Sequence, residues 1–220
     1  MTETTKTEVS LEELQKAGAH FGFSKSRRHP STNAFIFGSK NRLDIIDLEK
    51  TATELEKACD FVSQLATNKS TILFIGGKNE AQKIVEDEAS KIDMPYVASR
   101  WIGGTLTNFP QIRKRVDIML SLISQKEKGE LGKYTKKERL LIDRKIEKLK
   151  KMFGGIKDMT NLPKAVFIID PRFEDTALKE AKSLNSEDLN FYRIPLYDMP
   201  SQITHSHRHT IIATAKKMAD

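Results

Sequence analysis

Cysteine is scarce in this 220-residue sequence, and a long apolar run is missing. The one cysteine, Cys59, cannot form a disulfide within the chain, and we interpret it as a small buried apolar side chain on a helix. No stretch of about 18 apolar residues is present to cross a bilayer. The first ten residues are polar and lack the apolar core of a signal peptide. We therefore expect a cytoplasmic protein that has no membrane partner.

A complete nucleotide-binding motif is also absent. The segment Gly76-Gly77-Lys78 follows an apolar run, but it lacks the spacing of both common phosphate-binding glycine motifs. We interpret it as a tight strand-to-helix turn in which Lys78 is solvated or contacts an RNA phosphate. No cofactor is expected.

Metal sites and catalytic groups have few candidates, namely three alternating histidines and three aspartates near predicted strand ends: His205, His207, His209, Asp44, Asp47 and Asp170. The alternate spacing places all three histidines on one side only in an extended strand, and no cysteine or paired carboxylate completes a metal shell. No nucleophile and base in motif spacing accompany the aspartates, for which cap and turn roles suffice. We predict no metal site and no catalytic residue.

Positive charge is what the sequence does contain, and it is concentrated in one segment. The net charge is +7 and the isoelectric point is near 9.3, which suggests a polyanionic partner. Residues 110–153 hold fourteen of the 37 Lys and Arg and six of the 30 Asp and Glu, a net of +8. The remainder of the chain has 23 basic and 24 acidic residues, so this segment carries all of the excess.

The same segment has a helical period. Its apolar residues recur at steps of four and three in two stripes, Ile112, Val116, Met119, Ile123 and Ile142, Ile146, Leu149, Phe153. Residues 127–134, with two glycines, join the stripes, which predicts an antiparallel helical hairpin of coiled-coil type. We expect the hairpin to project, because its apolar stripe is narrow and its other faces are charged. The alternative is a pair of ordinary helices packed on a sheet.

Elsewhere, apolar runs alternate with amphipathic helices. The runs at residues 72–75 and 165–169 each precede a helical pattern, with Asn79 as a candidate cap for the first helix. Residues 95–98 add a short strand, residues 191–194 give weak support for another, and residues 35–38 and 43–48 form two short strands around a turn. A helix covers residues 11–17, and residues 25–30 form a loop. This alternation predicts an α/β protein with a parallel sheet.

Residues 100–109 combine an arginine, the only tryptophan and two glycines just before the basic segment. We interpret Trp101, Leu106 and Phe109 as apolar anchors that fix the base of the hairpin to the α/β body. Arg100 and Asn108 remain candidates to face phosphate or ribose.

Seven blocks of the sequence, in this order, carry a resemblance: His20-Phe21-Gly22 with Arg27-Arg28, then residues 35–38, 45–48, 72–76, 100–109, 153–159 and 168–172. Together they resemble the bacterial ribosomal protein S-two family. The resemblance implies a flavodoxin- or Rossmann-like body formed by residues 1–109 and 154–220, with residues 110–153 as the inserted hairpin. After Leu184 the sequence departs from the family, because a further strand and its Asp-Thr-Asn turn are not found.

The resemblance also implies a function. It points to a structural constituent of the small ribosomal subunit, located on cytoplasmic ribosomes, that binds 16S ribosomal RNA and takes part in translation. Neighbouring small-subunit proteins, and in many bacteria ribosomal protein S-one, would be its partners. An α/β enzyme acting on RNA or a nucleotide is the alternative, and it would require a convergent acid–base or nucleophile set.

The candidate RNA-binding residues are basic or amide side chains on the predicted loops, the glycine turn and the two ends of the hairpin. They are Lys25, Arg27, Arg28, Lys78, Arg100, Asn108, Arg113, Lys114, Arg115, Lys133, Lys136 and Lys137.

Overall fold

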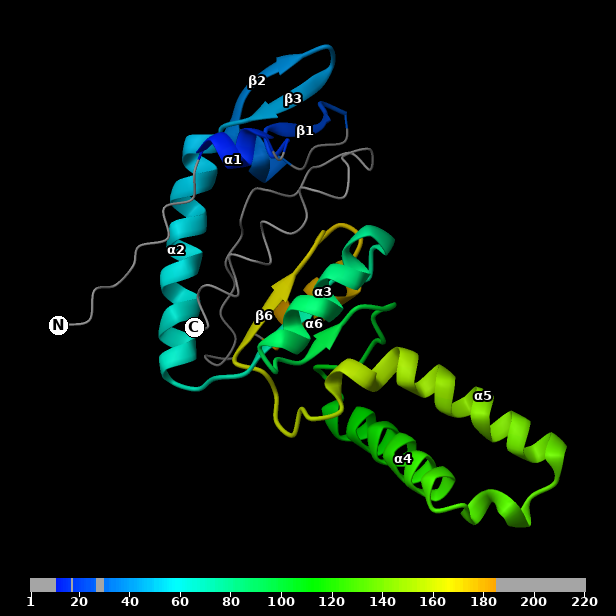
Figure 1. The fold of residues 1–220 in the computed structure, drawn as a ribbon. Helices are drawn as coiled ribbons and strands as arrows, with labels where there is room; N and C mark the ends of the chain where they lie inside the picture. Colours follow the sequence, from blue (N-terminus) through cyan, green and yellow to red (C-terminus); the bar gives the residue numbers. More distant parts are fainter. Residues whose placement is uncertain (1–10, 17, 27–29, 185–220) are drawn as a thin grey trace. The chain divides into compact units, whose positions relative to one another are not determined.

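The computed structural model in Figure 1 describes residues 11–16, 18–26 and 30–184. The chain divides into two compact units, residues 1–70 with 191–220 and residues 71–190. Several expectations from the sequence lie outside the described residues: those for Arg27 and Arg28, the three alternating histidines, the strand at residues 191–194 and the departure after Leu184.

The first unit contains an antiparallel sheet and a long helix. After α1 (Leu11–Lys16) come β1 (Phe21–Ser24), the 3-10 helix η1 (Pro30–Phe35), β2 (Ile36–Lys40) and β3 (Leu43–Ile46), in the sheet order β1-β3-β2. Asn41 and Arg42 both have positive φ, 52° and 65°, the conformation of a two-residue hairpin turn. The two predicted short strands with a turn between them are confirmed, although their bounds shift by a few residues.

The helix predicted to hold Cys59 is α2 (Leu48–Thr67), on which the Cys59 side chain is only partly buried. The Asp47 carboxylate accepts hydrogen bonds from Glu49 N at 3.1 Å and Lys50 N at 3.4 Å, which satisfies donors of the first helical turn. The predicted cap role of Asp47 is therefore confirmed.

The second unit contains a parallel sheet in the order β5-β4-β6. Its elements are β4 (Ile72–Ile75), α3 (Asn79–Lys91), β5 (Tyr96–Val97), α4 (Phe109–Glu127), η2 (Glu130–Lys133), α5 (Lys136–Phe153), η3 (Gly154–Ile156), β6 (Ala165–Ile168) and α6 (Asp175–Ser183). Strand β4 lies in the centre, with Ile75 paired to Val97 on one side and to Ile168 on the other. The predicted α/β class with a parallel sheet is confirmed.

The cap predicted at Asn79 is wrong. Lys78 occupies the N-cap position in extended conformation, and Asn79 is the first residue of α3. The physical reason is the turn that precedes the helix, in which the Gly77 N–H and the Lys78 ammonium both bind carboxylates from the segment after β6. These two contacts fix Lys78 outside the helix.

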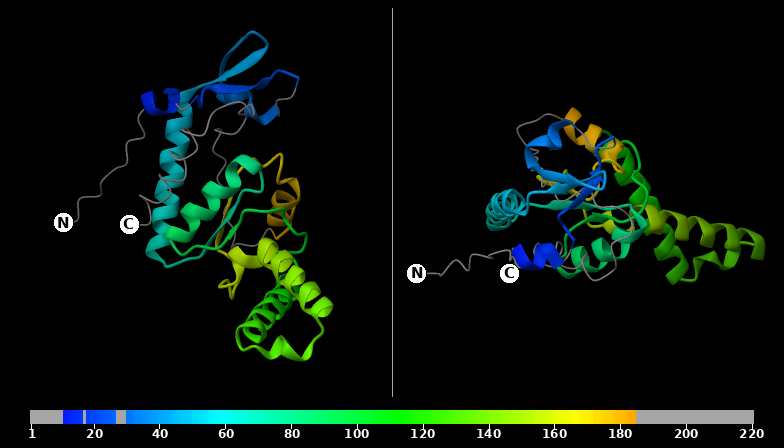
Figure 2. Two further views of the ribbon diagram at one scale, coloured as in Figure 1. Left: turned by 45° about the vertical axis from the view of Figure 1, so that its right-hand side comes forward. Right: turned by 90° about the horizontal axis from the view of Figure 1, so that it is seen from above.

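One apolar cluster joins the parallel sheet to the helices of its own unit. Leu73 and Ile75 point to the same face of β4 and pack with Ala177 and Ala181 of α6. The cluster continues through Trp101 and Leu106 into five buried residues of the basic segment, Ile112, Val116, Met119, Leu149 and Phe153, and into Ile156 beyond α5. The views in Figure 2 show α4 and α5 side by side.

Candidate nucleic-acid interface

Helices α4 and α5 carry the concentration of charge found in the sequence. Within the residues that the structure describes, two ion pairs occur in this segment, Arg113–Asp117 at 3.2 Å and Lys126–Asp143 at 2.7 Å. The other twelve Lys and Arg of residues 110–153 are exposed and have no ion-pair partner among the described residues. Because exposed cations without acidic partners keep their full charge toward solvent, this helix pair can attract a polyanion.

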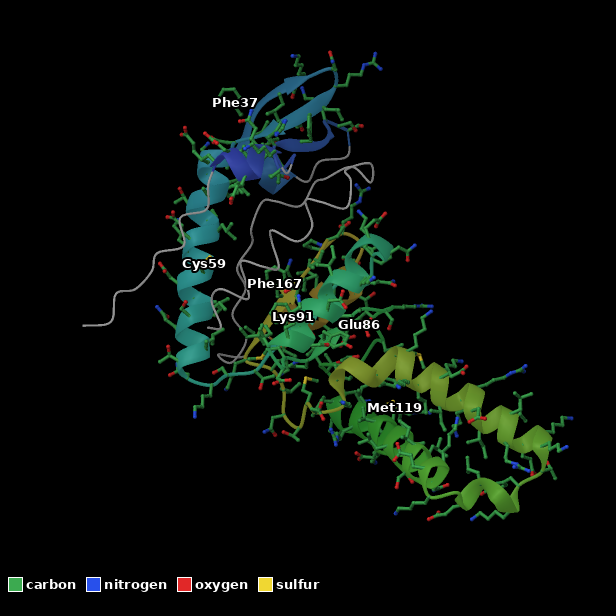
Figure 3. All side chains as sticks on the ribbon, viewed as in Figure 1. Phe37, Cys59, Glu86, Lys91, Met119 and Phe167 are labelled. Atoms are coloured by element: carbon green, nitrogen blue, oxygen red, sulfur yellow. The ribbon has the colours of Figure 1, made fainter. Side chains whose placement is uncertain are left out.

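Four of these cations line up on α5. Lys137, Arg144, Lys148 and Lys151 follow one another at steps of seven, four and three, so they lie on one side of the helix. That side is opposite Ile146, which is buried. Over fourteen residues the stripe is about 21 Å long at 1.5 Å per residue. Figure 3 shows nitrogen-tipped side chains along the side of α5 that faces away from α4.

Three members of this stripe were not among the RNA-binding residues predicted from the sequence: Arg144, Lys148 and Lys151. The signal was present, since their helical phase is opposite to that of the predicted apolar stripe. The prediction instead chose basic clusters that are adjacent in sequence, and such clusters spread around a helix.

The start of α5 has a defined geometry. The Thr135 hydroxyl accepts from the Glu138 N–H at 3.4 Å, and the Glu138 carboxylate accepts from the Thr135 N–H at 2.9 Å, which is a capping box. The pKa of the Glu138 carboxyl group is lowered by the hydrogen bond from the Thr135 N–H and by a second one that the Thr135 hydroxyl donates to it at 3.0 Å. The predicted site residues Lys136 and Lys137 are exposed in this first turn. Lys133 lies just before it, with its ammonium 5.5 Å from the centre of the Tyr134 ring.

The three adjacent basic residues near the start of α4 differ in their contacts. Lys114 and Arg115 are exposed and have no contact with an acidic residue among the described residues. Arg113 points back toward the body, where its Nη1 donates to the carbonyl oxygens of Lys157 at 2.8 Å and Met159 at 3.2 Å. Arg113 therefore connects the first turn of α4 to the segment after α5.

The loop before α4 is held by a residue that the sequence did not indicate. The Glu180 carboxylate on α6 accepts from the indole Nε1 of Trp101 at 3.1 Å, from Gly104 N at 2.7 Å and from Leu106 N at 3.2 Å. Trp101 and Leu106 are buried in the apolar cluster and Phe109 packs against it, as expected of apolar anchors. No local pattern could have found Glu180, because it lies more than seventy residues from its partners.

Arg100 and Asn108 lie at the two ends of this loop, and both are exposed. Asn108 occupies the N-cap position of α4 without a side-chain capping bond. Lys25 is exposed in a turn after β1, in the other compact unit.

The glycine turn after β4 is closed by carboxylates. The Gly77 N–H donates to Glu174 Oε1 at 2.9 Å, and Lys78 Nζ lies 3.1 Å from Asp170 Oδ2. A Cβ at Gly77 would collide with the Glu174 carboxylate and would lie 2.7 Å from Ser99 O, so only glycine fits there. Lys78 is thus not freely solvated, contrary to one option of the prediction, because Asp170 binds its ammonium.

Burial changes the pKa of the Glu174 carboxyl group in this turn. Glu174 is 3% exposed, and removal from water raises the pKa of its carboxyl group, with the charge of Asp170 acting in the same direction. The hydrogen bond from Gly77 N opposes this rise in pKa. The position where phosphate binds in nucleotide-binding α/β folds, the N-terminal end of a helix after a strand, is therefore already occupied by a carboxyl group of the chain itself.

Metal-binding and membrane-spanning features are absent from the described residues. These residues contain no group of three His, Cys, Asp or Glu side chains placed to hold a metal ion. None of the helices in the described ranges combines the length and the apolar character needed to cross a membrane.

Comparison with known proteins gives a consistent result. The sequence model of the family described as Ribosomal protein S2 matches residues 14–187, and thus ends close to the point where the sequence departs from the expected pattern. The Small ribosomal subunit protein uS2 of Roseiflexus castenholzii is 45% identical over 184 residues, which cover 84% of this chain and 70% of that protein. The protein of the same name from Hahella chejuensis is 46% identical over 178 residues, covering 81% and 70%, and that of Chloroflexus aurantiacus is 41% identical over 181 residues, covering 82% and 76%. The chain belongs to the ribosomal protein S2 family.

Proposed function

We propose that this chain is a non-enzymatic, structural component of the small ribosomal subunit that binds 16S ribosomal RNA through phosphate contacts. The observation that carries this proposal is the set of twelve exposed Lys and Arg of residues 110–153 that have no acidic partner among the described residues, ten of them on α4 and α5. The names of the relatives, all small ribosomal subunit proteins, support the assignment to the ribosome and hence to the cytoplasm.

The helix pair is best explained as an inserted antiparallel hairpin of coiled-coil type, residues 110–153, between β5 and β6. Val116 and Met119 on α4 and Ile146 and Leu149 on α5 are buried at steps of three, which is the spacing of a narrow helical seam. The other faces are exposed and mainly charged, as expected of an element that contacts a polyanion, although Ile118, Leu120, Leu140 and Leu141 are exposed on them as well. Residues 1–109 and 154–220 form the α/β body in this proposal.

Phosphate recognition fits the chemistry of these side chains. Long exposed lysines neutralise phosphates as point charges and need no fixed geometry, whereas base reading requires rigid bidentate groups. We assign phosphate contacts to the stripe on α5, to Lys114 and Arg115 on α4, and to Lys133 and Lys136 near the turn. Arg100, Asn108, Lys25, Arg27 and Arg28 remain candidates for further RNA contacts, and Lys78 and Arg113 are assigned structural roles first, because each has a protein partner.

Neighbouring small-subunit proteins and ribosomal protein S-one are the proposed protein partners. Co-sedimentation of a tagged chain with small subunits in a sucrose gradient tests the structural role. Calorimetry with ATP, GTP and NAD tests the enzymatic alternative, since a stoichiometric micromolar site for any of them would contradict a purely structural role.

RNA binding is tested with a charge-removal variant of the stripe. In the variant, Lys137→Gln, Arg144→Gln, Lys148→Gln and Lys151→Gln are combined, which leaves every buried residue of α5 in place. We expect weaker binding to a 16S RNA fragment and a log–log salt slope that shrinks by roughly 0.7–0.9 for each phosphate that the variant no longer neutralises.

A matched control removes four exposed lysines from other elements, with Lys40→Gln, Lys69→Gln, Lys83→Gln and Lys182→Gln combined. Its net charge changes equally, so it measures the effect of overall charge alone. If both variants bind RNA with the same affinity and salt slope, the α5 stripe is not the phosphate-binding surface.

A further inference from the structure

The Glu180 carboxylate accepts four hydrogen bonds from a single loop. Its Oε1 accepts from Trp101 Nε1 at 3.1 Å and Gly104 N at 2.7 Å, and its Oε2 accepts from Leu106 N at 3.2 Å and the Thr107 hydroxyl at 3.4 Å. A carboxylate offers about four lone-pair sites, so the loop uses its full capacity.

The conformation of the loop directs these donors toward the Glu180 carboxylate. Gly104 has a φ of 90°, a conformation that residues with a Cβ rarely adopt, and it turns the chain so that the N–H groups of residues 104 and 106 face the same side. Two local bonds complete the turn, Thr105 Oγ1 to Ile102 O at 2.6 Å and Asn108 N to Gly104 O at 2.8 Å. Without the carboxylate, the Gly104 and Leu106 N–H groups would be deprived of the acceptor that they share.

Glu180 itself is rigidly placed. Ala177 and Ala181, one turn before it and one residue after it, are fully buried in the apolar cluster, so α6 cannot shift without disturbing the core. The loop continues without interruption into α4, which begins at Phe109. The Glu180 carboxylate, on a helix that packs against the sheet, therefore contacts the loop directly before the start of α4.

The negative charge of Glu180 bears on its role. A negative group close to a surface that attracts a polyanion weakens that attraction, so its presence there requires a compensating role. That role is to satisfy a set of donors that converge on one position in the loop. Because the carboxylate takes up these N–H groups, they are not left to bind phosphate.

We propose that Glu180 is a positioning residue, whose carboxylate acts as an internal anion that fixes the Trp101–Thr107 loop and thereby orients α4 and its exposed cations toward RNA. The last step rests on the proposed function. The fixing of the loop does not, and it can be measured on the free protein.

The primary variant is Glu180→Gln, in which one oxygen is replaced by an amide nitrogen that cannot accept from the N–H and hydroxyl donors it faces. Glu180→Asp keeps the charge but shortens the side chain by one C–C bond, roughly 1.5 Å. Glu147→Gln on α5 is the matched control, because Glu147 is exposed, has no hydrogen bond or ion pair among the described residues, and changes the net charge equally.

The first measurement is hydrogen exchange on the full-length free protein. We expect the amides of Gly104 and Leu106 to exchange about tenfold to a hundredfold faster in Glu180→Gln, because this variant removes hydrogen bonds to a charged group. Trp101 is the only tryptophan, so its indole N–H gives one resonance, which should shift in the same variant. Glu180→Asp should lie between wild type and Glu180→Gln, and Glu147→Gln should match wild type.

The second measurement is affinity for a 16S RNA fragment. Removal of a negative charge alone should tighten binding or leave it unchanged, and this is the result we expect for Glu147→Gln. If Glu180 positions the loop, the Glu180→Gln variant should instead bind the RNA fragment several-fold more weakly than wild type. Its helix content by circular dichroism should be unchanged.

The outcomes separate the two proposals. Loop amides as protected in Glu180→Gln as in wild type would overturn the positioning role, whatever the RNA result. Faster exchange together with RNA affinity equal to that of Glu147→Gln would overturn the link from loop to RNA. Failure of the α5 stripe variant to change RNA binding would overturn the proposed function itself. If Glu180→Gln does not fold, the same comparisons are made with Glu180→Asp.

Discussion

Replacement of Arg113 by glutamine should destabilise the second unit, although the residue belongs to a basic cluster. Its Nη1 donates to Lys157 O at 2.8 Å and Met159 O at 3.2 Å, and its Nε lies 3.2 Å from Asp117 Oδ1. These interactions link α4 to the segment that follows α5. A glutamine at position 113 is too short to reach both carbonyl oxygens.

The size of the expected destabilisation depends on how exposed the Arg113 side chain is. A hydrogen bond to a charged group contributes about 1.5–3 kcal/mol when it is well shielded. The Arg113 side chain is 30% exposed and a single nitrogen makes both bonds, so water recovers part of this contribution in the variant. The ion pair with Asp117, which is 57% exposed, adds only about 0.3–0.5 kcal/mol. We expect the free energy of unfolding to fall by about 1.5–2 kcal/mol.

Urea unfolding followed by the fluorescence of Trp101 measures this change, because Trp101 is buried in the same apolar cluster as the first turns of α4. Lys114→Gln is the control, since Lys114 is the adjacent residue, is exposed and should change stability by less than about 0.5 kcal/mol. Arg113→Lys keeps the charge but lacks the planar fork, so it should be destabilised nearly as much as Arg113→Gln. Equal urea midpoints for Arg113→Gln and Lys114→Gln would refute the reasoning. An RNA-binding test that substitutes residues 113–115 together would mix this decrease in stability with the decrease in charge.

Three further predictions concern burial. Met119→Ala should cost about 2–4 kcal/mol of unfolding free energy and the adjacent Ile118→Ala far less, because Met119 is 1% and Ile118 is 44% exposed, and urea unfolding of both variants compares them. The raised pKa of Glu174 means that the native state holds its proton more tightly than the unfolded state. Its contribution to stability therefore falls as pH rises from about the ordinary value of 4.5 through the native pKa, and the stability of Glu174→Gln relative to wild type should increase over that window, whereas a difference independent of pH would contradict the assignment. Burial, with Asp60 and Glu56 nearby, raises the pKa of the Cys59 thiol from 9.0 to about 11, so a thiol reagent at pH 8 should react with the native protein at least about a hundredfold more slowly than with the denatured chain, and equal rates would disprove this.

Local patterns predicted the parts of the fold that depend on burial. The steps of four and three that placed Ile112, Val116 and Met119 on one stripe report a side of α4 that is buried, and the apolar run at residues 72–75 is a strand buried at all four positions. The turn between β2 and β3 was also predicted, and the structure places Asn41, a residue type that tolerates positive φ, in it. In these cases the information lies within a few residues of the element it describes.

Polar partners were predicted less well, because they depend on contacts between distant segments. Asn79 is a good cap residue, yet the turn before α3 is fixed by Glu174, 97 residues from Gly77, and by Asp170, 92 residues from Lys78. Arg113 was grouped with Lys114 and Arg115 by adjacency, while the carbonyls it binds lie 44 and 46 residues away. A sequence pattern indicates which side of a helix is polar, but not which polar group a given side chain will meet.

The two carboxylates at the start and within α6, Glu174 and Glu180, explain how this α/β fold differs from its nucleotide-binding counterparts. Such folds usually bind phosphate with main-chain N–H groups at the carboxyl ends of parallel strands. Here the Gly77 N–H binds Glu174, and the Gly104 and Leu106 N–H groups bind Glu180, six residues further along the chain. Since main-chain donors that already hold an internal anion are not open to an external one, attraction of a polyanion has to come from side chains. The excess of exposed cations is concentrated in residues 110–153, so we place the proposed phosphate-binding surface on this helix pair and not at the edge of the sheet.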